Sequence, residues 1–399
     1  MPRIVIVLTD PPLPFGLAAA RWSYVLVRGL TDRGHRVTTF AVCGDPAQAA
    51  QVADLFPAPR YDVRLDPPPL RRGLRAKLET WRRPSSYVFG PDLRRALRAE
   101  LARGFDVLHL EQTWSGWLGL DHVARAVLNV HNLYAIDLAA RPPATLHDRL
   151  RRAAVLRAER MLLRRYRQIT TLTPRLTAEV GRISPGASVH TVPLGIDLAL
   201  YPFEESPTPS PLPRPPVVGL VGSFGWEPTR SAGERLLTRL WPVLRAQVPG
   251  VRLRLVGRSA RAALGHLARS PDIDMFEDVP DIIPHFRALD VMVYAPGPAS
   301  GMKVKVLEAL ALGVPVVTNA DGVEGLPAVD GLDAGLAEDD AGLIARAVAL
   351  LSDPARRIAQ RRAARALLEA HCRPELVLDR LEQVYATLPA IVTERPWRG

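Results

Sequence analysis

The 399-residue chain has only three lysines among its 52 basic residues, two cysteines and no long apolar run. Cys43 and Cys372 lie far apart in the sequence and lack the spacing of metal ligands. The sequence therefore supports neither a disulfide framework nor a zinc site, and a reducing, cytoplasmic setting fits best. No stretch approaches the roughly 18 apolar residues that would span a bilayer, and the N-terminal apolar run is too short for a signal peptide. We expect a soluble protein that is at most peripheral to a membrane.

Several catalytic motifs are absent as well. The segment that follows the first apolar run, TDPPLPFGLAAARW, contains no GxGxxG fingerprint, and no acidic residue stands where a ribose contact needs one. This absence disfavours a nicotinamide-dependent oxidoreductase. The motifs GxxxxGK[ST], GxSxG and HExxH are also missing, which argues against P-loop nucleotide hydrolysis, nucleophile-elbow hydrolysis and zinc proteolysis.

The composition is that of a globular protein, with 47% hydrophobic and 23% charged residues, and the length favours two or three domains. The net charge of +11 is weak evidence for an anionic partner, because a GC-rich coding bias also enriches arginine, alanine and proline. Basic residues cluster in 70–83 and 150–167. Such a segment is either a basic amphipathic helix on anionic lipid or on an anionic acceptor, or a solvated helix packed on its own domain. We expect no nucleic-acid partner, because no recognised binding motif appears.

Strand-like apolar runs alternate with helical stretches in two blocks, which predicts parallel sheets with helices on both faces. The first block holds runs at 4–8, 37–42, 107–110, 127–130 and 169–172, and the second holds runs at 217–221, 252–256, 273–276, 291–294 and 315–318. Between them, the seven prolines of YPFEESPTPSPLPRPP (201–216) predict a linker. We expect domains at 1–200 and 217–375, with a helical tail at 376–399 that packs on the first domain.

Doubly wound domains bind ligands at the carboxyl ends of their strands, and two facing domains create a cleft. In the first half, we expect the loop 10–16 and the pair His131 and Asn132 to line this cleft. In the second half, the corresponding strand ends carry Gly222 with Ser223, and Gly257 with Arg258.

The segment APGPASGMKVKVLEALALGVPVVTNADGVEGL (295–326) contains two of the three lysines. A loop rich in Gly, Pro and Ser opens into a short helix, predicted at 304–312, and Gly313 ends it. Backbone amides at the start of a helix, together with Lys303 and Lys305, form a phosphate-binding site. Gly301, Lys305 and Glu308 fall near one helix face, so that the Glu308 carboxylate can hold a ribose. The alternative is an ordinary surface Lys/Glu pair.

Other residues at the predicted cleft also allow two interpretations each. His131 is either a structural residue or a group that binds a hydroxyl or handles a proton, and the neighbouring Asn132 favours the functional role. Glu111 either contacts the acceptor or caps a helix. Arg258 and Arg230 either approach phosphate or cap their own segments.

The chain resembles the family 4 retaining glycosyltransferases, whose GT-B fold consists of two facing Rossmann-like domains. The matching segments are GLAAARWSYVLVRGLTDRGHRVTTF, VLNVHNL, VHTVPLGIDLALYPF, GSFGWEPTRSAGERLLTRLWPVLRAQVPGVRLRLVGR, VPDIIPHFRALDVMVYAP and the 295–326 segment. They occur in order over most of the chain, which makes the signal strong.

The resemblance implies that Glu308 binds the nucleotide ribose, that residues 301–304 offer amides to the diphosphate or sugar, and that His131 faces the donor sugar. Gly16 lets a backbone approach the donor phosphate or the acceptor. The remaining residues implied on the donor side are Gly222, Ser223, Arg230, Arg258, Val279, Ser300, Met302 and Val304, and those on the acceptor side are Arg21, Glu111 and Asn132.

Two departures from the family pattern stand out. Many relatives carry a second glutamate eight residues before the ribose glutamate, where this chain has Ser300. The Arg/Lys pair that relatives place after the first strand of the second domain is not evident in GSFGWEPTRS. We infer that Lys303 and Lys305, with Arg230 or Arg258, supply the positive charge instead.

The expected activity is transfer of a sugar from a UDP- or GDP-linked donor to an acceptor hydroxyl with retention, without a metal or other cofactor. A nucleotide-sugar epimerase and a non-catalytic sugar-nucleotide-binding scaffold remain alternatives. The acceptor stays open among a lipid-linked saccharide, a growing polysaccharide and a small natural product. The basic segments favour slightly an acceptor at the membrane, with peripheral contact at its inner face.

Overall fold

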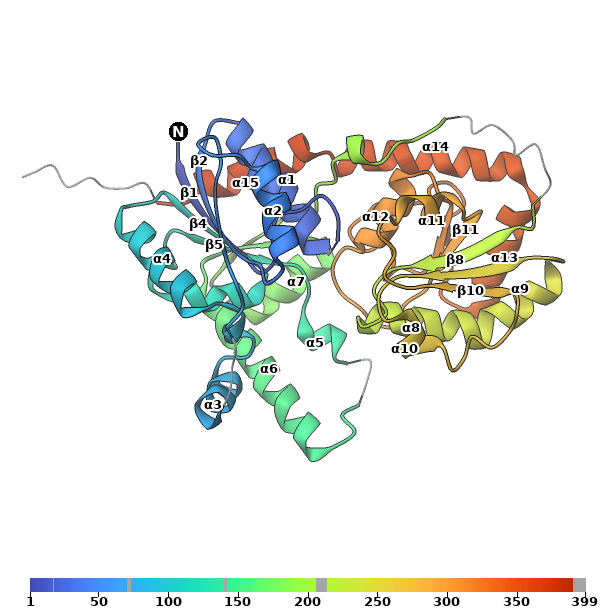
Figure 1. The fold of residues 1–399 in the computed structure, drawn as a ribbon, viewed down its shortest axis with the longest axis horizontal. Coiled ribbons are helices and arrows are strands. Elements are labelled where there is room, and N and C mark those ends of the chain that lie inside the picture. The colour runs from blue at the N-terminus through green and yellow to red at the C-terminus, as the bar shows by residue number, and fades with distance from the viewer. Residues whose placement is uncertain (17, 70–72, 140–141, 206–213, 390–399) are drawn as a thin grey trace, which may run out of the picture. The chain divides into compact units, whose positions relative to one another are not determined.

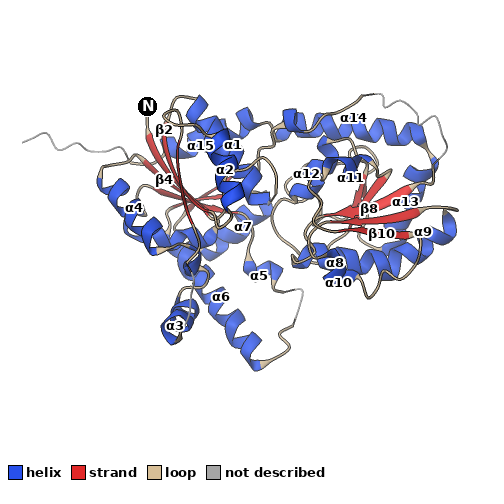
Figure 2. Ribbon diagram, in the orientation of Figure 1, coloured by secondary structure: helices blue, strands red, loops and turns tan. Residues whose placement is uncertain are grey.

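The computed structural model describes residues 1–16, 18–69, 73–139, 142–205 and 214–389. The chain forms two compact units. Unit 1 comprises Met1–Ile196 together with Pro374–Gly399, and unit 2 comprises Asp197–Arg373. Each unit is an α/β structure with one parallel sheet (Figures 1 and 2).

Unit 1 contains a seven-stranded sheet in the order β3-β2-β1-β4-β5-β6-β7. Its strands are β1 (Arg3–Leu8), β2 (Arg36–Val42), β3 (Asp62–Asp66), β4 (Val107–Glu111), β5 (Ala126–Val130), β6 (Gln168–Thr171) and β7 (Ser188–Thr191). Its helices are α1 (Ala18–Asp32), α2 (Pro46–Leu55), α3 (Leu74–Arg82), α4 (Pro91–Ala102), α5 (Tyr134–Asp137), α6 (Leu146–Arg165), α7 (Pro174–Ile183) and α15 (Pro374–Ala386). All the strand pairs are parallel; for example, Ile4 of β1 lies opposite both Val37 and Val107.

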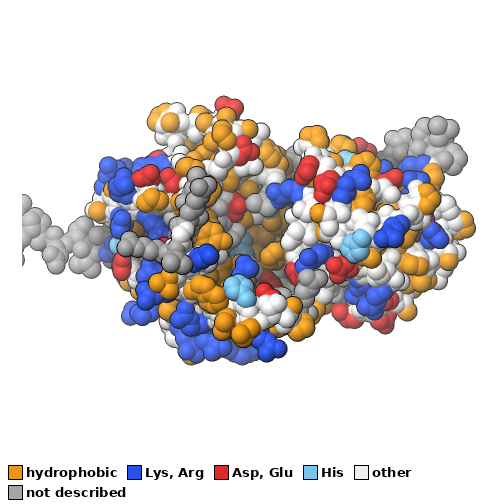
Figure 3. Space-filling view, turned by 60° about the horizontal axis from the view of Figure 1, so that its bottom comes forward, with side chains coloured by type: hydrophobic (Ala, Val, Ile, Leu, Met, Phe, Trp, Pro, Cys, Tyr) orange, Lys and Arg blue, Asp and Glu red, His pale blue; other side chains and the backbone are white. Residues whose placement is uncertain are grey.

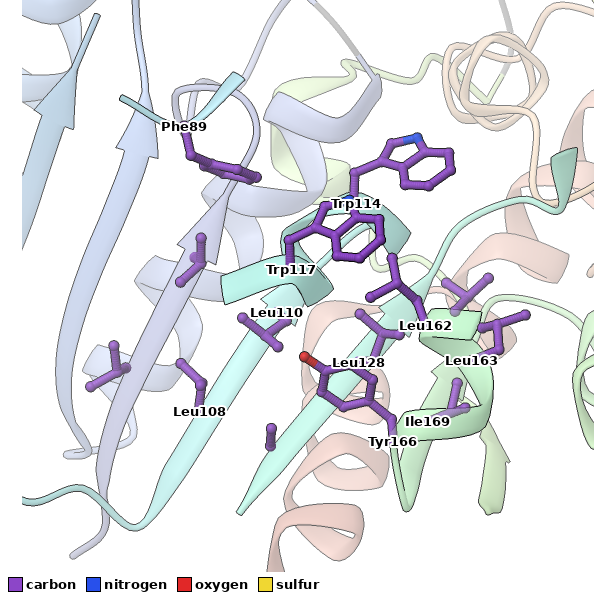
Figure 4. Packing of buried hydrophobic residues seen from close by; sticks show 14 of the residues in the cluster. Phe89, Leu108, Leu110, Trp114, Trp117, Leu128, Leu162, Leu163, Tyr166 and Ile169 are labelled. Atoms are coloured by element: carbon purple, nitrogen blue, oxygen red, sulfur yellow. The ribbon is translucent and has the colours of Figure 1, made fainter. Parts of the chain in front are cut away.

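The central strands of unit 1 are apolar on both faces because helices cover both sides of the sheet. All residues of β4 and β5 are buried. On one face, the aromatic side chains of Trp117 and Tyr166 pack with Leu128 of β5 and with Leu162 of α6 (Figure 4). This cluster fixes the second half of α6 against the sheet.

The last helix of the chain, α15, belongs to unit 1 and packs on α1. Leu378 lies against the α-carbon of Gly29, where an added methyl group would meet its Cδ1 at 2.2 Å. Arg33 donates to Asp379 and Glu382, each at 2.6 Å. A side chain larger than hydrogen at position 29 would therefore force the Leu378 side chain to move.

Unit 2 repeats the same plan with six strands in the order β10-β9-β8-β11-β12-β13. The strands are β8 (Val217–Val221), β9 (Arg252–Val256), β10 (Ile273–Phe276), β11 (Val291–Tyr294), β12 (Val316–Thr318) and β13 (Gly335–Leu336). The helices are α8 (Glu227–Arg235), α9 (Trp241–Gln247), α10 (Ala260–Leu264), α11 (Ile283–Arg287), α12 (Val304–Ala311), α13 (Asp340–Ser352) and α14 (Pro354–His371). In both units the strand order reverses beside the first strand, between β1 and β4 and between β8 and β11. Ligands of doubly wound sheets bind at the carboxyl ends of the strands at this reversal.

The proline-rich segment predicted as a linker begins inside unit 2. Tyr201 is buried there, and the guanidinium groups of Arg361 and Arg365 lie over the Phe203 ring, at 5.9 and 5.5 Å from its centroid. Residues 206–213, which hold four of the seven prolines, lie outside the described residues. Unit 2 thus begins at Asp197, whereas the second domain was expected to begin at residue 217 after a linker, and it ends at Arg373, two residues before the expected 375. Across the part of the chain that the structure describes, no helix has the length and apolar character needed to cross a membrane.

Candidate functional site

The predicted donor-side residues converge where the strand order of unit 2 reverses. β8 ends at Val221 and β11 at Tyr294, and the two strands pair in parallel. Gly222 follows β8, and a methyl group on its α-carbon would meet Lys305 Cε at 2.6 Å. Gly257 follows β9, and a methyl group there would overlap the Gly222 carbonyl oxygen at 1.9 Å. Only glycines therefore allow this close approach of the two loops and of the lysine.

Lys305 places its ammonium group at this reversal point. Its Nζ lies 4.7 Å from the centroid of the Tyr294 ring, which is a cation–π contact. Burial, followed by the like charge of Lys303, lowers the pKa of Lys305 to about 7, although Glu308 opposes the shift. An anionic ligand at this position would restore the charged form, because an opposite charge favours it.

Lys303 lies in a different environment from its neighbour. It is 6% exposed, and its Nζ donates to the carbonyl oxygens of Gly301 and, at 3.2 Å, of Ser300. Glu324 Oε2 lies 3.9 Å from the same nitrogen. The Lys303 ammonium thus ties down the loop before α12, where Gly301 adopts a left-handed conformation with φ of 78°. Its direct action on a phosphate stays a prediction.

Helix α12 begins at Val304 and ends at Ala311, and Gly313 follows with φ of 71°. The prediction of 304–312 was therefore correct to one residue. The side chain of the N-cap residue, Lys303, makes no hydrogen bond to the first amides of this helix, and the start of a helix favours an anion. Glu308 lies one turn further along; it is 4% exposed and accepts a hydrogen bond from Tyr201 Oη at 3.2 Å.

The other donor-side candidates vary in how closely they approach α12. Ser300 and Met302 are buried in the loop before it, and Val304 is its first residue. The amide of Gly297 in this loop donates to Ser231 Oγ of α8 at 3.2 Å, which joins α8 to the same site. The remaining candidates have other surroundings. Arg230 lies in α8 and pairs with Glu227, Arg258 is exposed, and Ser223 and Val279 are partly exposed.

In unit 1, the carboxyl end of β4 holds a buried carboxylate. Glu111 is 2% exposed and accepts hydrogen bonds from four side chains, which come from α1, β4, β5 and the residue after β5. The donors are Trp22 Nε1 at 2.9 Å, His109 Nε2 at 2.7 Å, Asn129 Nδ2 at 3.0 Å and His131 Nε2 at 2.5 Å. Glu111 therefore does not cap a helix. Its oxygens are committed to these donors, so a direct contact with an acceptor has no support in the geometry.

Electrostatics keep Glu111 ionised. Burial alone raises the pKa of this carboxyl, but His131, hydrogen bonds from both histidines and the field of His109 outweigh burial and hold its pKa well below the usual range. The charged carboxylate in turn fixes the ring of His131, which is partly exposed at the strand end. The structure thus gives Glu111 the task of orienting His131.

The network extends from His109 to the last helix. Tyr385 Oη of α15 lies 2.8 Å from His109 Nδ1. His109 Nε2 faces Glu111, so the Tyr385 hydroxyl hydrogen-bonds to the other nitrogen of the same ring. On the other side, Thr170 Oγ1 donates to Asn129 Oδ1 at 3.0 Å and orients that amide. The carboxylate, and through it His131, is therefore held from α15, α1 and three neighbouring strands.

The other acceptor-side candidates are Asn132, Gly16 and Arg21. Asn132 Nδ2 donates to Asp137 Oδ2 of α5 at 2.7 Å. Gly16 is exposed, with φ of 87° and open space around its α-carbon. Arg21 is partly buried on α1, next to Trp22. Their roles stay predictions.

The sequence reasoning missed several polar residues of the two sites, namely Trp22, His109, Asn129, Tyr201 and Tyr385. A signal for two of them was present: His109 and Asn129 interrupt the apolar runs VLHLE and AVLNV. A polar side chain inside a strand that is buried on both faces needs a buried partner.

Two family models match the chain. Residues 19–200 match the model described as Glycosyltransferase Family 4, and residues 215–353 match the model described as Glycosyl transferases group 1. The two matches cover most of both units. No curated protein matches the sequence.

Solved structures resemble the chain over almost its whole length. Sucrose-phosphate synthase from Thermosynechococcus elongatus is similar with a TM-score of 0.72 and 21% identity, covering 97% of this chain and 99% of that one. HepE from Anabaena, in complex with UDP and glucose, has a TM-score of 0.68 and 14% identity, covering 97% and 100%. WaaG, a glycosyltransferase involved in lipopolysaccharide biosynthesis, has a TM-score of 0.63 and 17% identity, covering 94% of this chain and 98% of that one. At these identities the likeness shows the fold.

Proposed function

This chain belongs to the family 4 glycosyltransferases and has their GT-B fold, and we propose that it moves a sugar from a nucleotide-diphosphate donor to an acceptor hydroxyl with retention of anomeric configuration. The observation that carries the donor site is the position of Lys305. A partly buried ammonium with a lowered pKa lies at the strand-order reversal of unit 2, beside the start of α12.

The arrangement suits a nucleoside diphosphate. The amides at the start of α12 and the Lys305 ammonium bind the diphosphate oxygens, because both present positive charge at one point. Glu308, one turn along the same helix, accepts hydrogen bonds from the ribose hydroxyls. Tyr201 already donates to this carboxylate and orients it.

His131 acts on the sugar, held in orientation by Glu111. Its Nε2–H is engaged by the carboxylate, so the imidazole presents a fixed edge to a hydroxyl of the donor sugar. Pre-orientation of this kind lowers the entropic cost of reaching the reactive geometry.

In the chemical step, the acceptor oxygen bonds to the anomeric carbon on the face from which the diphosphate departs. The bond from that carbon to the phosphate oxygen breaks, and the departing phosphate takes the acceptor's proton. Attack on the same face retains the configuration. Lys305 and the helix amides stabilise the charge that grows on the leaving group, so we propose that no metal is required.

The donor is a UDP- or GDP-linked sugar. A structure of HepE with UDP-glucose is among the similar folds, which makes UDP-glucose the first donor to try. Thermal shift and donor hydrolysis with a panel of UDP- and GDP-sugars test the proposal, both with and without EDTA. We expect one donor to raise the melting temperature and to be hydrolysed in either condition.

Variants locate the activity. Lys305→Ala and Glu308→Ala should each lose donor binding and hydrolysis while retaining the wild-type circular dichroism spectrum. Lys77→Ala, which removes the third lysine of the chain from the exposed surface of α3, is the matched control and should bind donor normally. Normal donor binding by both site variants would refute the proposed donor site. Donor binding by the wild type without any turnover across an acceptor panel would refute the proposed transferase activity.

A further inference from the structure

Helices α3 and α6 form an arm of unit 1 that extends beyond its sheet (Figure 1). The buried residues of α6 are Ala158, Glu159, Leu162 and Leu163, all in its second half. The first twelve residues of α6, and the described side chains of α3, are not buried. The arm is thus anchored at one end and open to its surroundings at the other.

Large apolar side chains stand exposed on the open part of this arm. Leu146 is 71% exposed, Leu78 57% and Leu150 51%, and Trp81 of α3 is 36% exposed. On α3, Leu78 and Trp81 are three residues apart, and on α6, Leu146 and Leu150 are four apart, so each pair shares a helix face. Exposed apolar groups gathered in this way mark a surface that contacts something else.

Positive charge surrounds these apolar groups. The two helices carry ten arginines and lysines against three acidic residues. The three acids are engaged: Glu79 lies 3.7 Å from Arg94, Asp148 forms the capping box of α6, and Glu159 is buried. The outward face therefore has a strong excess of cations, and basic side chains gather among hydrophobic ones at the lower left of Figure 3.

The two helices are fixed to each other, so the arm presents one surface. The Trp81 ring meets the His147 ring edge-on at 5.9 Å, and Arg157 donates to the carbonyl oxygen of Trp81 at 3.3 Å. Lys77 and Arg82 on α3, and Arg149 on α6, flank the exposed apolar residues and are themselves exposed.

We propose that this α3/α6 surface binds an anionic lipid bilayer. Leucine and tryptophan enter the boundary between headgroups and acyl chains, while the lysine and arginine stems lie along it and their charges meet the lipid phosphates. A soluble polyanion would be recognised by the cations alone and would leave Leu78, Leu146 and Leu150 in water. The apolar groups therefore favour lipid. The inference does not depend on the donor site.

Co-sedimentation of the full chain with vesicles tests the proposal. We expect binding to vesicles of phosphatidylglycerol and phosphatidylcholine, and about tenfold or more weaker binding to phosphatidylcholine alone, because each basic residue near an anionic surface strengthens the attraction. The triple variant Leu78→Ser, Leu146→Ser, Leu150→Ser and the triple variant Lys77→Glu, Arg82→Glu, Arg149→Glu should each reduce binding about tenfold or more. All six positions are exposed, so both variants should melt at the wild-type temperature.

The double variant Val329→Ser, Leu332→Ser is the matched control, since both residues are 54% exposed in unit 2. It should bind the anionic vesicles as the wild type does, and so should Lys305→Ala. Binding that needs the basic residues but not the three leucines would assign the surface to a soluble polyanion and overturn the proposal. Absence of wild-type binding to anionic vesicles would overturn it as well.

Discussion

The buried carboxylate of unit 1 offers the sharpest test of how the fold orients a functional side chain. Glu111 accepts hydrogen bonds from four donors and carries the negative charge that faces two histidines. Glu111→Gln keeps the shape of the side chain and removes the charge. The glutamine has one acceptor oxygen, and its amide nitrogen donates, so at least one of the four donors would face another donor.

The magnitude follows from burial. Leaving one buried donor unsatisfied costs about 1–3 kcal/mol, and removing one partner of a buried charged pair costs about 3–5 kcal/mol. Because the glutamine retains some of the hydrogen bonds, we expect the free energy of unfolding at pH 7 to fall by about 1–3 kcal/mol, the lower of these two ranges. The folded-state pKa of Glu111 is depressed, so its contribution to the free energy of unfolding is present above the unfolded value of about 4.5 and is lost as the pH falls. The difference in free energy of unfolding between wild type and variant should therefore decrease as the pH is lowered below about 4.5.

Activity separates orientation from stability. Urea unfolding at several pH values gives the free energies, and steady-state transfer or donor hydrolysis gives kcat and KM. A misplaced His131 can reduce kcat by up to about 100-fold, whereas donor affinity, which rests on unit 2, should change little. Glu100→Gln is the control: Glu100 is 5% exposed and binds the guanidinium groups of Arg3, Arg64 and Arg103.

Both glutamine variants should lose stability, and only Glu111→Gln should lose kcat. Wild-type kcat in Glu111→Gln would refute the idea that the carboxylate positions His131. An equal fall of kcat in Glu100→Gln would show that activity merely follows the stability of unit 1.

Three further predictions concern single groups. Lys305→Met should raise the melting temperature but abolish nucleotide binding in calorimetry. The pKa of Lys305 is lowered to about 7 in the folded protein, so the unfolded chain holds more protons between about pH 7 and 10.5. The free energy of unfolding of the wild type should therefore rise with pH in this range, and the variant should lack that rise. Burial, aided by Asp137, raises the pKa of Glu159 to about 7, so wild-type stability should fall as the pH rises from about 4.5 to 7; urea unfolding of Glu159→Gln should show no such fall. Gly257→Ala should destabilise unit 2 by more than about 1 kcal/mol in urea unfolding, because its methyl group meets the Gly222 carbonyl; a variant as stable as wild type would contradict the close approach of these loops.

The inner strands could be predicted from the sequence because burial on both faces makes them continuous apolar runs. β8 and β9 lie at the expected residues, and β1, β2, β4 and β5 differ by one residue at an end. Of the four edge strands, β10 lies at the expected residues 273–276, and the other three were missed for the same reason. β3 has the sequence DVRLD and β7 has SVHT, and most of their side chains remain partly exposed, so neither is an apolar run. β13 has only two residues.

The donor-side segment was predictable because its parts are close in sequence. The turn at Gly301, the helix start at Val304 and the left-handed Gly313 that follows the helix all agree with local backbone preferences. Lys303 and Lys305 could not be told apart from the sequence. Their difference depends on the turn at Gly301, which brings two carbonyl oxygens to the Lys303 ammonium and leaves Lys305 to pack against Gly222 and Tyr294.

The network around Glu111 could not be derived in this way, because its contacts join distant segments. Trp22 and Glu111 are 89 residues apart, and Tyr385 and His109 are 276 apart. A buried polar residue in a strand indicates that a partner exists, but only the packing of α1 and α15 on the sheet determines which residue it is.

The two units place opposite charges at equivalent points of the same fold. The strand beyond the reversal is β4 in unit 1 and β11 in unit 2; a buried carboxylate ends the first, and the Lys305 ammonium lies over the last residue of the second. The Glu111 carboxylate accepts its hydrogen bonds from side chains within unit 1. At the corresponding point of unit 2, Lys305 brings positive charge beside the start of α12. Because a charge of opposite sign attracts an anion and a like charge repels it, we expect the nucleotide diphosphate to bind at the point in unit 2 and not beside the carboxylate of unit 1.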